Sequence, residues 1–303
     1  MDFTTRRQFL ISIAAAGMAG LTPSARASAP ITRPIPSSGE PIPAIGMGTW
    51  ITFNVGDDPV LRARCTDVLR AFFNLGGGVI DSSPMYGSAE AVVGHGLAKL
   101  GRPRGLFSAT KVWTPVTGHG VSQMDTSERL WGEKRFDLLQ IHNLVNWQGH
   151  LETLRARQAA GRIRYLGITT SHGSRHGELL KVMAAEKLDF VQFTYNIVRR
   201  EAEARLLPAA ADRGLAVIAN RPFQRGALID EVSRHPLPAW AAEIDCANWA
   251  QFLLKFVVSH PAVTCVIPAT SRVDHMIENM GALHGRLPDA KMRRRMVQHV
   301  ESL

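Results

Sequence analysis

The sequence predicts an α/β fold, a closed (β/α)8 barrel of the TIM type preceded by a short β-hairpin. Short, almost entirely apolar segments alternate with longer amphipathic segments eight times along the chain. This pattern is typical of a parallel sheet whose strands are covered by helices. A chain of 303 residues accommodates eight such units in a single barrel.

The position of a glycine run favours the barrel over an open sheet that binds dinucleotides. The glycines at 76–78 precede the apolar segment at 79–82. A Rossmann fold needs its glycines after the first strand, where they open a helix. The Rossmann motif is therefore missing from this sequence.

Composition indicates one domain, residues 31–303. With 45% hydrophobic and 20% charged residues, the chain can bury one large core, and no repeat or low-complexity linker divides it. The net charge of +9 is scattered. The arginines at 293–295 lie between Met292 and Met296 on an expected helix, where a solvated face is favoured over a nucleic-acid patch. Cys65, Cys246 and Cys265 lack metal-ligand spacing, so buried thiols and no metal are expected.

The first 27 residues differ from the rest of the chain. Arg6 and Arg7 precede an apolar stretch, residues 9–21, that is too short to span a bilayer and has no polar face. Ala25, Arg26 and Ala27 then form a small-x-small cleavage pattern. This segment resembles a bacterial twin-arginine signal peptide. We expect export by the twin-arginine machinery, cleavage after residue 27, a periplasmic location and no stable membrane insertion afterwards.

The first half of the barrel is assigned from apolar periodicity. Residues 31–36 and 40–43 form the hairpin, 45–50 the first strand, 60–75 a helix, 79–82 the second strand, 88–100 a helix and 106–112 the third strand. No element is assigned between residues 113 and 136. The fourth strand follows at 137–142.

The second half continues the alternation. Strands are expected at 165–169, 190–195, 215–220 and 263–267. Helices are expected at 149–158, 177–186, 201–211 and 240–259, with a closing pair at 273–283 and 289–300. These elements complete the eight units.

Three consecutive strands end on polar side chains that could share a site. Asp81, Lys111 and His142 end strands two, three and four, separated by 30 and 31 residues. Because the carboxyl ends of barrel strands meet at one rim, we expect these side chains to be neighbours, with Tyr86 in the loop between the first two. Each alone has an ordinary explanation: a helix cap, a rim charge, a buried histidine or a loop aromatic. Their joint placement favours a catalytic site.

These residues belong to motifs that resemble the aldo-keto reductase family. The matching motifs, in chain order, are Gly46-Met47-Gly48-Thr49-Trp50, Asp81-Ser82-Ser83-Pro84-Met85-Tyr86-Gly87 with Glu90 and Gly94, Lys111-Val112-Trp113, Gln140-Ile141-His142, and Ile267-Pro268 followed by Glu278-Asn279. The resemblance implies a barrel that binds NADP(H) without a Rossmann fold and reversibly reduces an aldehyde or ketone to an alcohol. Tyr86 would donate the proton, Lys111 would lower its pKa, Asp81 would pair with Lys111, and His142 would orient the carbonyl. The alternative is a regulatory or scaffold protein that binds the cofactor with little turnover.

The resemblance also assigns a cofactor site and a substrate pocket. Thr169 and Thr170 stand where the family usually has Ser-Asn, Asn220 where an aromatic residue commonly stacks, and His275 where an arginine is usual. The guanidinium of Arg272 suits a phosphate, so NADP(H) is favoured over NAD(H). Trp50, Trp113 and Asn143 are expected around a substrate of modest size. The expected cofactor contacts are Gly48, Thr49, Trp50, Thr169, Thr170, Gln192, Asn220, Arg221, Phe223, Thr270, Ser271, Arg272, His275, Glu278 and Asn279.

Overall fold

Eight parallel strands form the centre of the structure, a computed structural model that describes residues 29–303. The sheet has the order β10-β9-β8-β7-β6-β5-β4-β3, so strands adjacent in sequence are adjacent in the sheet. Bridges from Ile45 to Val266 and from Gly48 to Ala269 join its two edges into a nearly closed barrel. The predicted (β/α)8 barrel is therefore confirmed. The strands are β3 (Met47–Gly48), β4 (Val79–Asp81), β5 (Phe107–Val112), β6 (Phe136–Ile141), β7 (Ile163–Thr169), β8 (Phe190–Thr194), β9 (Ala216–Asn220) and β10 (Cys265–Val266).

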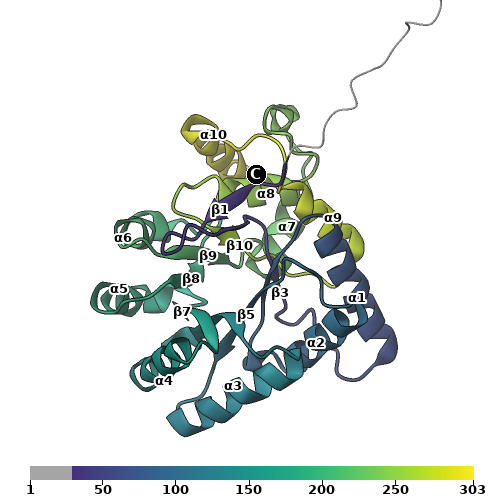
Figure 1. The fold of residues 1–303 in the computed structure, drawn as a ribbon. Coiled ribbons are helices and arrows are strands. Elements are labelled where there is room, and N and C mark those ends of the chain that lie inside the picture. Colours follow the sequence, from purple (N-terminus) through teal and green to yellow (C-terminus); the bar gives the residue numbers. More distant parts are fainter. Residues whose placement is uncertain (1–28) are drawn as a thin grey trace, which may run out of the picture.

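The helices surround the strands (Figure 1). Their apolar faces pack against the sheet and form the larger hydrophobic cluster with its outer face. The helices are α1 (Pro59–Asn74), α2 (Ala89–Lys99), α3 (Thr117–Trp131), α4 (Trp147–Ala159), α5 (His176–Ala185), α6 (Leu206–Asp212), α7 (Ala227–Val232), α8 (Trp249–Val258), α9 (Val273–Gly281) and α10 (Ala290–Glu301).

Two helices are absent from the sequence-based assignment, and two others differ from it. Helix α3 contains two glycines and is largely polar, and only Met124 and Trp131 supply large buried apolar side chains, so its periodicity is weak. The short helix α7 is the other helix that the sequence did not predict. The expected helix at 240–259 is a 3-10 turn, Ala239–Ile244, and α8, separated at Asp245, which has a φ of 51°. The expected helix at 201–211 similarly begins with a 3-10 turn, Glu201–Glu203, before α6.

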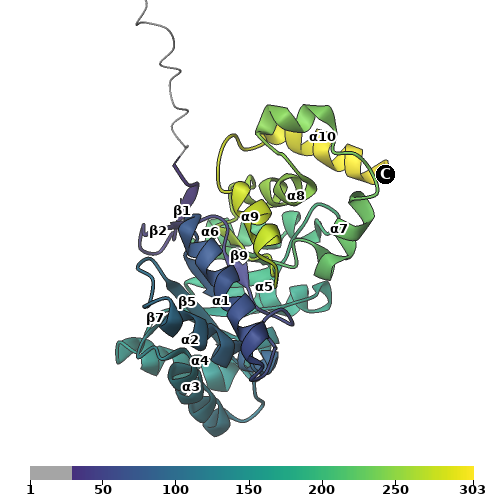
Figure 2. The same ribbon diagram turned by 90° about the vertical axis from the view of Figure 1, so that its right-hand side faces the viewer.

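The predicted hairpin, β1 (Thr32–Pro34) and β2 (Pro41–Pro43), is antiparallel and closes one end of the barrel. Ile35 and Ile42 are buried in one cluster with the inward-facing residues of the strands. Figure 2 shows the hairpin on one side of the barrel and α7 on the other. The amino ends of the strands are thus plugged, and the carboxyl ends are left for a site.

A buried carboxylate fixes α2 and α3 against β5. Glu90 accepts hydrogen bonds from the Thr110 hydroxyl (2.5 Å), the Ser127 hydroxyl (3.0 Å) and the Trp131 indole (3.2 Å). At Gly94 a Cβ would lie 1.8 Å from the carbonyl oxygen of Leu130, so the two helices can approach only at glycine. This packing holds β5, which carries Lys111.

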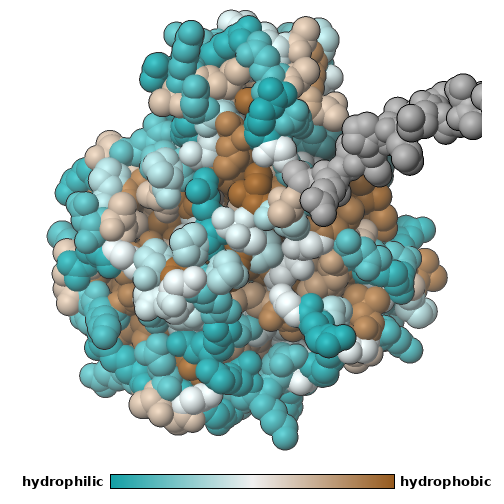
Figure 3. All heavy atoms as spheres, turned by 45° about the horizontal axis from the view of Figure 1, so that its top comes forward, coloured by the Kyte–Doolittle hydropathy of each residue, from teal (hydrophilic) through white to brown (hydrophobic). Residues whose placement is uncertain are grey.

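Hydrophilic residues cover most of the face shown in Figure 3, with hydrophobic residues in patches between them. In the basic run of α10, Arg293 donates to Tyr195 and Glu203, and Arg295 stacks on Trp240.

The three cysteines are buried and free, as predicted. Within residues 29–303 no helix is long and apolar enough to cross a membrane, and no group of acidic, histidine or cysteine side chains could hold a metal ion. The predicted signal peptide, residues 1–27, lies outside the described residues.

Candidate active site

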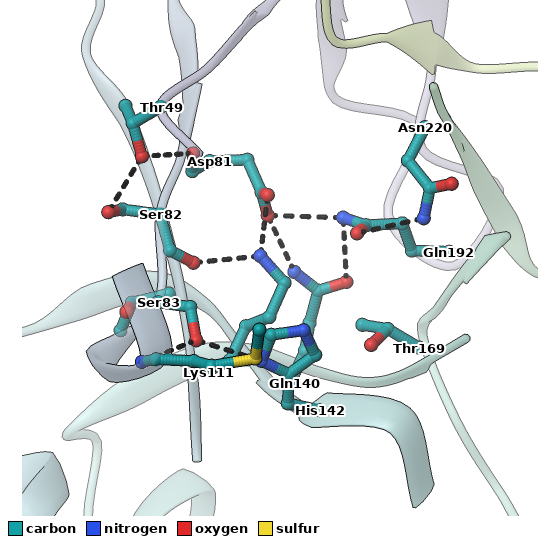
Figure 4. A network of polar contacts seen from close by, with 12 residues as sticks. Thr49, Asp81, Ser82, Ser83, Lys111, Gln140, His142, Thr169, Gln192 and Asn220 are labelled. Carbon is teal, nitrogen blue, oxygen red and sulfur yellow. Dashed lines mark hydrogen bonds and ion pairs between the residues drawn. The ribbon is translucent and has the colours of Figure 1, made fainter. Parts of the chain in front are cut away.

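A buried ion pair lies at the carboxyl ends of β4 and β5 (Figure 4). The Lys111 ammonium is 2.5 Å from Asp81 Oδ2 and donates a second bond of 2.7 Å to the Ser82 carbonyl oxygen. Both side chains are buried. Because neither charge is exposed to bulk water, the pair is unscreened, and Asp81 raises the pKa of Lys111 although burial opposes this.

Two amide side chains complete the coordination of the carboxylate. The Nε2 groups of Gln140 and Gln192 each donate a 3.1 Å hydrogen bond to Asp81 Oδ1. Gln140 was not expected in the site, although it is paired in register with Lys111. Its inward position, two residues before His142, is the signal that could have identified it. The Asp81 carboxylate is therefore oriented by donors from β5, β6 and β8.

Tyr86 lies in the turn Pro84–Tyr86 that follows β4. Its ring centre is 5.2 Å from the Lys111 ammonium and 5.7 Å from the His142 ring, which it meets edge to face. Burial raises the pKa of Tyr86, and the Lys111 charge opposes this without overcoming it. The predicted lowering by Lys111 is therefore present but smaller than the effect of burial. The phenol stays protonated near neutral pH, as a general acid requires.

His142 follows β6 and is buried. Its Nδ1 is 2.8 Å from the Ser83 hydroxyl. Burial, with a smaller contribution from Lys111, lowers the pKa of His142 to about 2, so the ring is neutral in the physiological range. If the Ser83 hydroxyl donates to Nδ1, the proton is on Nε2, where it can be donated to a substrate oxygen.

A cavity of about 840 Å³ opens above this cluster. Asp81, Tyr86 and His142 line one part of it. Twelve of the expected cofactor contacts also line it: Gly48, Thr49, Trp50, Thr169, Gln192, Asn220, Arg221, Phe223, Thr270, His275, Glu278 and Asn279. The strand-end residues and the segment around α9 therefore line one cavity. This cavity is large enough for a dinucleotide.

Two buried polar atoms beside the strand ends fit the carboxamide of a nicotinamide. Asn143 Oδ1 and Thr170 Oγ1 have no hydrogen-bond partner within residues 29–303. Buried polar atoms without partners are rare and point to a missing ligand or water. A carboxamide offers both a donor and an acceptor to such atoms. The acceptor on Asn143 and the hydroxyl of Thr170 therefore suit the carboxamide of the expected cofactor.

Five expected contacts lie outside the cavity lining. Thr170 and Asn143 do not line it, and Ser271 is exposed. Arg272 is also exposed, and its guanidinium is held by Asp274. The Trp113 side chain is 42% exposed, and its backbone is bonded to Gln123. The cavity thus includes Trp50 from the expected substrate pocket and excludes Trp113.

Asn220, at the end of β9, has all its polar atoms engaged. Its Nδ2 donates to the Thr170 carbonyl (2.9 Å) and to Gln192 Oε1 (3.4 Å), and its Oδ1 accepts from the Thr194 hydroxyl (2.8 Å). An amide therefore forms this wall of the cavity where the family commonly has an aromatic ring. It is linked through Gln192 to the Asp81 carboxylate.

The segment between β9 and α8 contributes residues that were not expected. Arg225 stacks on the Trp50 ring, with its guanidinium carbon 4.4 Å from the ring centre. Arg221, Gln224 and Arg225 all have positive φ. Pro222, Gly226, Asp230, Ser233, His235, Leu237, Asn248 and Trp249 also line the cavity. The unassigned length of residues 221–239 was the available signal, because long loops at strand ends often carry function.

Known proteins resemble most of the chain. The model of the Aldo/keto reductase family matches residues 44–296. "Methylglyoxal reductase YeaE" of Escherichia coli (strain K12) is 29% identical over 260 residues, covering 83% of this chain and 89% of that protein. "Aldo-keto reductase yakc [NADP(+)]" of Schizosaccharomyces pombe is 24% identical over 301 residues, covering 83% and 87%. The crystal structure of an aldo/keto reductase from Klebsiella pneumoniae in complex with NADP and acetate superposes with a TM-score of 0.74 at 26% identity, covering 86% of this chain and 93% of that one.

Proposed function

The chain belongs to the aldo/keto reductase family, and from this premise we propose that it reduces an aldehyde or ketone to an alcohol with NADPH. The observation that carries the proposal is the buried Lys111–Asp81 pair beside Tyr86 and His142, at the base of a cavity that also reaches Glu278. The reaction is reversible.

When bound, NADPH supplies the hydride. Tyr86 gives its proton to the carbonyl oxygen, and the Lys111 ammonium stabilises the phenolate that this leaves. Asp81 and the Ser82 carbonyl hold the ammonium in place. Neutral His142 donates from Nε2 to the oxygen as negative charge develops there.

Different residues of the cavity suit different parts of the cofactor. Gln192 and Thr169, with the two unpartnered atoms nearby, suit the nicotinamide. Thr270, His275, Glu278 and Asn279 suit the adenosine end. Arg272 lies next to this end and favours NADP(H), whose extra phosphate needs a cation. A relative named for NADP(+) and a similar structure in complex with NADP support this choice over NAD(H).

The enzyme assay uses purified residues 28–303 and a panel of aldehydes and ketones, with consumption of NADPH followed by fluorescence. Because a relative is a methylglyoxal reductase, dicarbonyl compounds such as methylglyoxal belong in the panel. Turnover with at least one compound is expected. Tight NADPH binding without turnover across the panel, together with a stable protein partner on pull-down, would instead support the regulatory or scaffold alternative.

We also propose that residues 1–27 are a twin-arginine signal and that the mature chain is periplasmic. Arg6, Arg7 and the cleavage pattern ending at Ala27 support this proposal. The twin-arginine route exports folded proteins, so a cofactor bound in the cytoplasm could travel with the chain and stabilise it.

Cell fractionation tests the location. The native chain is compared with a variant carrying Arg6→Lys and Arg7→Lys. A periplasmic form beginning near Ser28 is expected only with the paired arginines. If both chains stay cytoplasmic and uncleaved, the export proposal is wrong, whereas the enzymatic proposal is unaffected.

A further inference from the structure

The backbone that directly follows His142 is strained. Asn143, Leu144 and Asn146 have φ values of 53°, 54° and 46°. This left-handed region costs energy in residues other than glycine, and asparagine tolerates it better than leucine does. Such strain persists only where the surrounding structure holds the backbone, and it is common at functional sites. The contacts that hold this turn therefore also influence where the His142 ring lies.

Two side chains from the next βα unit hold the backbone of Asn143. Its N–H donates a 3.1 Å hydrogen bond to the hydroxyl of Thr169, the last residue of β7. Its carbonyl oxygen accepts a hydrogen bond from Nη1 of Arg175, in the 3-10 turn Gly173–Arg175 between β7 and α5. Side chains thus satisfy both backbone polar groups of this residue, outside any helix or sheet ladder.

The Arg175 guanidinium is itself held by helix α5. Its Nε and Nη2 both donate to Glu178 Oε2, at 2.9 Å and 2.6 Å, and Glu178 lies in the first turn of α5. A guanidinium presents its donors in one rigid plane. The two bonds to Glu178 therefore set the direction in which Nη1 points, toward the Asn143 carbonyl. Arg175 and Glu178 thus connect α5 to the turn after His142.

The His142 ring depends on this connection because little else restrains it. Its Nδ1 is bonded to the Ser83 hydroxyl at 2.8 Å, and the Tyr86 ring meets it edge to face. Within residues 29–303 no other hydrogen bond holds the ring. A shift of the backbone after His142 would therefore move Nε2 relative to the carbonyl oxygen that it must reach. A displacement of about 1 Å can cost on the order of 10²-fold in rate.

We propose that Arg175 is a positioning residue of the active site. By holding the Asn143 carbonyl oxygen, it fixes the strained turn and with it the direction of His142 Nε2. The inference rests on the proposed reductase function. Arg175 does not line the cavity, so its effect on the reaction passes through the main chain of residues 142–143. The loop between β7 and α5 thereby contributes to catalysis at the end of β6.

Steady-state kinetics of Arg175→Met test the proposal, because methionine keeps much of the apolar stem and removes the donors. We expect kcat to fall by about 10-fold or more, since Nε2 is no longer aimed at the substrate oxygen. The KM for the carbonyl compound and the dissociation constant for NADPH should change far less. The isotope effect on kcat with 4-deuterated NADPH should rise, because a slower hydride transfer then limits turnover. A loss of folded protein alone would lower kcat without changing the isotope effect.

Arg155→Met is the matched control. Arg155 lies on α4 and pairs with Glu186 at 2.7 Å, and its removal also breaks one arginine–glutamate pair. It should leave kcat and the isotope effect unchanged. Arg175→Lys, which keeps the charge and one donor, should recover part of kcat. Glu178→Gln should lower kcat less than Arg175→Met, because Nη1 keeps its acceptor. A kcat and isotope effect in Arg175→Met that equal those of the wild type would overturn the proposal.

Nitrogen-15 NMR of the histidine rings separates this inference from the proposed reaction. The His142 ring signals are assigned as those lost in His142→Asn. In Arg175→Met they should shift or broaden, because the ring exchanges among positions, and in Arg155→Met they should match the wild type. That result supports the positioning role even if no carbonyl compound is reduced. Identical His142 signals in the wild type and Arg175→Met would overturn it, even if reduction is observed and kcat falls.

Discussion

Two ion pairs that each contain a residue predicted for the site differ sharply in their surroundings. Lys111 and Asp81 have side-chain exposures of 0% and 2%, whereas those of Arg272 and Asp274 are 62% and 60%. The first joins two strands across 30 residues of chain, and the second joins residues two apart at the start of α9. The first pair is rigid and unscreened, while the second is hydrated and easily exchanged for another partner.

The comparison teaches where catalysis and selectivity are placed. The buried pair is surrounded by Gln140, Gln192 and the Ser82 carbonyl, so its charge is fixed before any substrate arrives. In the exposed pair Arg272 is held by Asp274, and we expect the cofactor phosphate to compete with this carboxylate. We therefore expect the chemistry to depend on the buried pair, and the choice between cofactors on the exposed one.

Breaking the buried pair should have the largest effect. Lys111→Met leaves the Asp81 carboxylate buried without its cation, so the free energy of unfolding should fall by about 3–5 kcal/mol. Turnover should fall by on the order of 10²-fold or more, since the phenolate loses its stabilising charge. Chemical denaturation and NADPH consumption measure the two effects.

The control is the double variant Lys111→Met with Asp81→Asn. Removing the carboxylate charge as well should recover much of the lost stability, but no activity. Stability and turnover in Lys111→Met that both match the wild type would contradict the account of the buried pair.

The buried region should also make stability depend on pH through His142. Its pKa is about 2 in the folded chain and 6.5 when unperturbed, so below 6.5 only the unfolded chain takes up this proton. The free energy of unfolding is therefore highest above pH 6.5 and decreases as the pH falls. Between pH 7 and pH 5 it should decrease by about 2 kcal/mol through this group. In His142→Asn this dependence should be weaker by that amount. An unchanged pH dependence in the variant would show that His142 is not held neutral.

Breaking the exposed pair should have the smallest effect and should change affinity alone. Wild-type protein should bind NADPH more tightly than NADH by roughly 10-fold. Arg272→Ala should remove most of that preference without changing the melting temperature, and Asp274→Asn should increase it, because the guanidinium is released. Fluorescence titration with both cofactors measures the change. Equal affinities in the wild type would mean that Arg272 does not select the phosphate.

The buried pair and the loop after β9 differ in how far the sequence could predict them. Register in a parallel barrel fixes which strand-end residues meet, so Asp81, Lys111 and His142 could be brought together from their spacing. The loop after β9 has no such periodicity. Its positive-φ backbone and the contact between Arg225 and Trp50 depend on tertiary packing, which local sequence does not encode.

Two further features were difficult to predict for separate reasons. Helix α3 forms because Trp131 and Ser127 pack on Glu90, a contact that outweighs the low helix propensity of its glycines. The pairing of Arg272 with Asp274 was overlooked because its motif was interpreted only as a phosphate site. Surface charges choose among several nearby partners, so their contacts are less determined by sequence than those of buried groups.

The most direct test of the central claim is Tyr86→Phe, which removes one hydroxyl from the site and leaves the Lys111–Asp81 pair intact. Turnover of the best carbonyl substrate and the dissociation constant for NADPH are measured on the same preparation. The account predicts that turnover falls by on the order of 10²-fold or more while NADPH affinity and melting temperature stay near wild type. Full turnover in Tyr86→Phe would contradict it, because the proton would then come from another group.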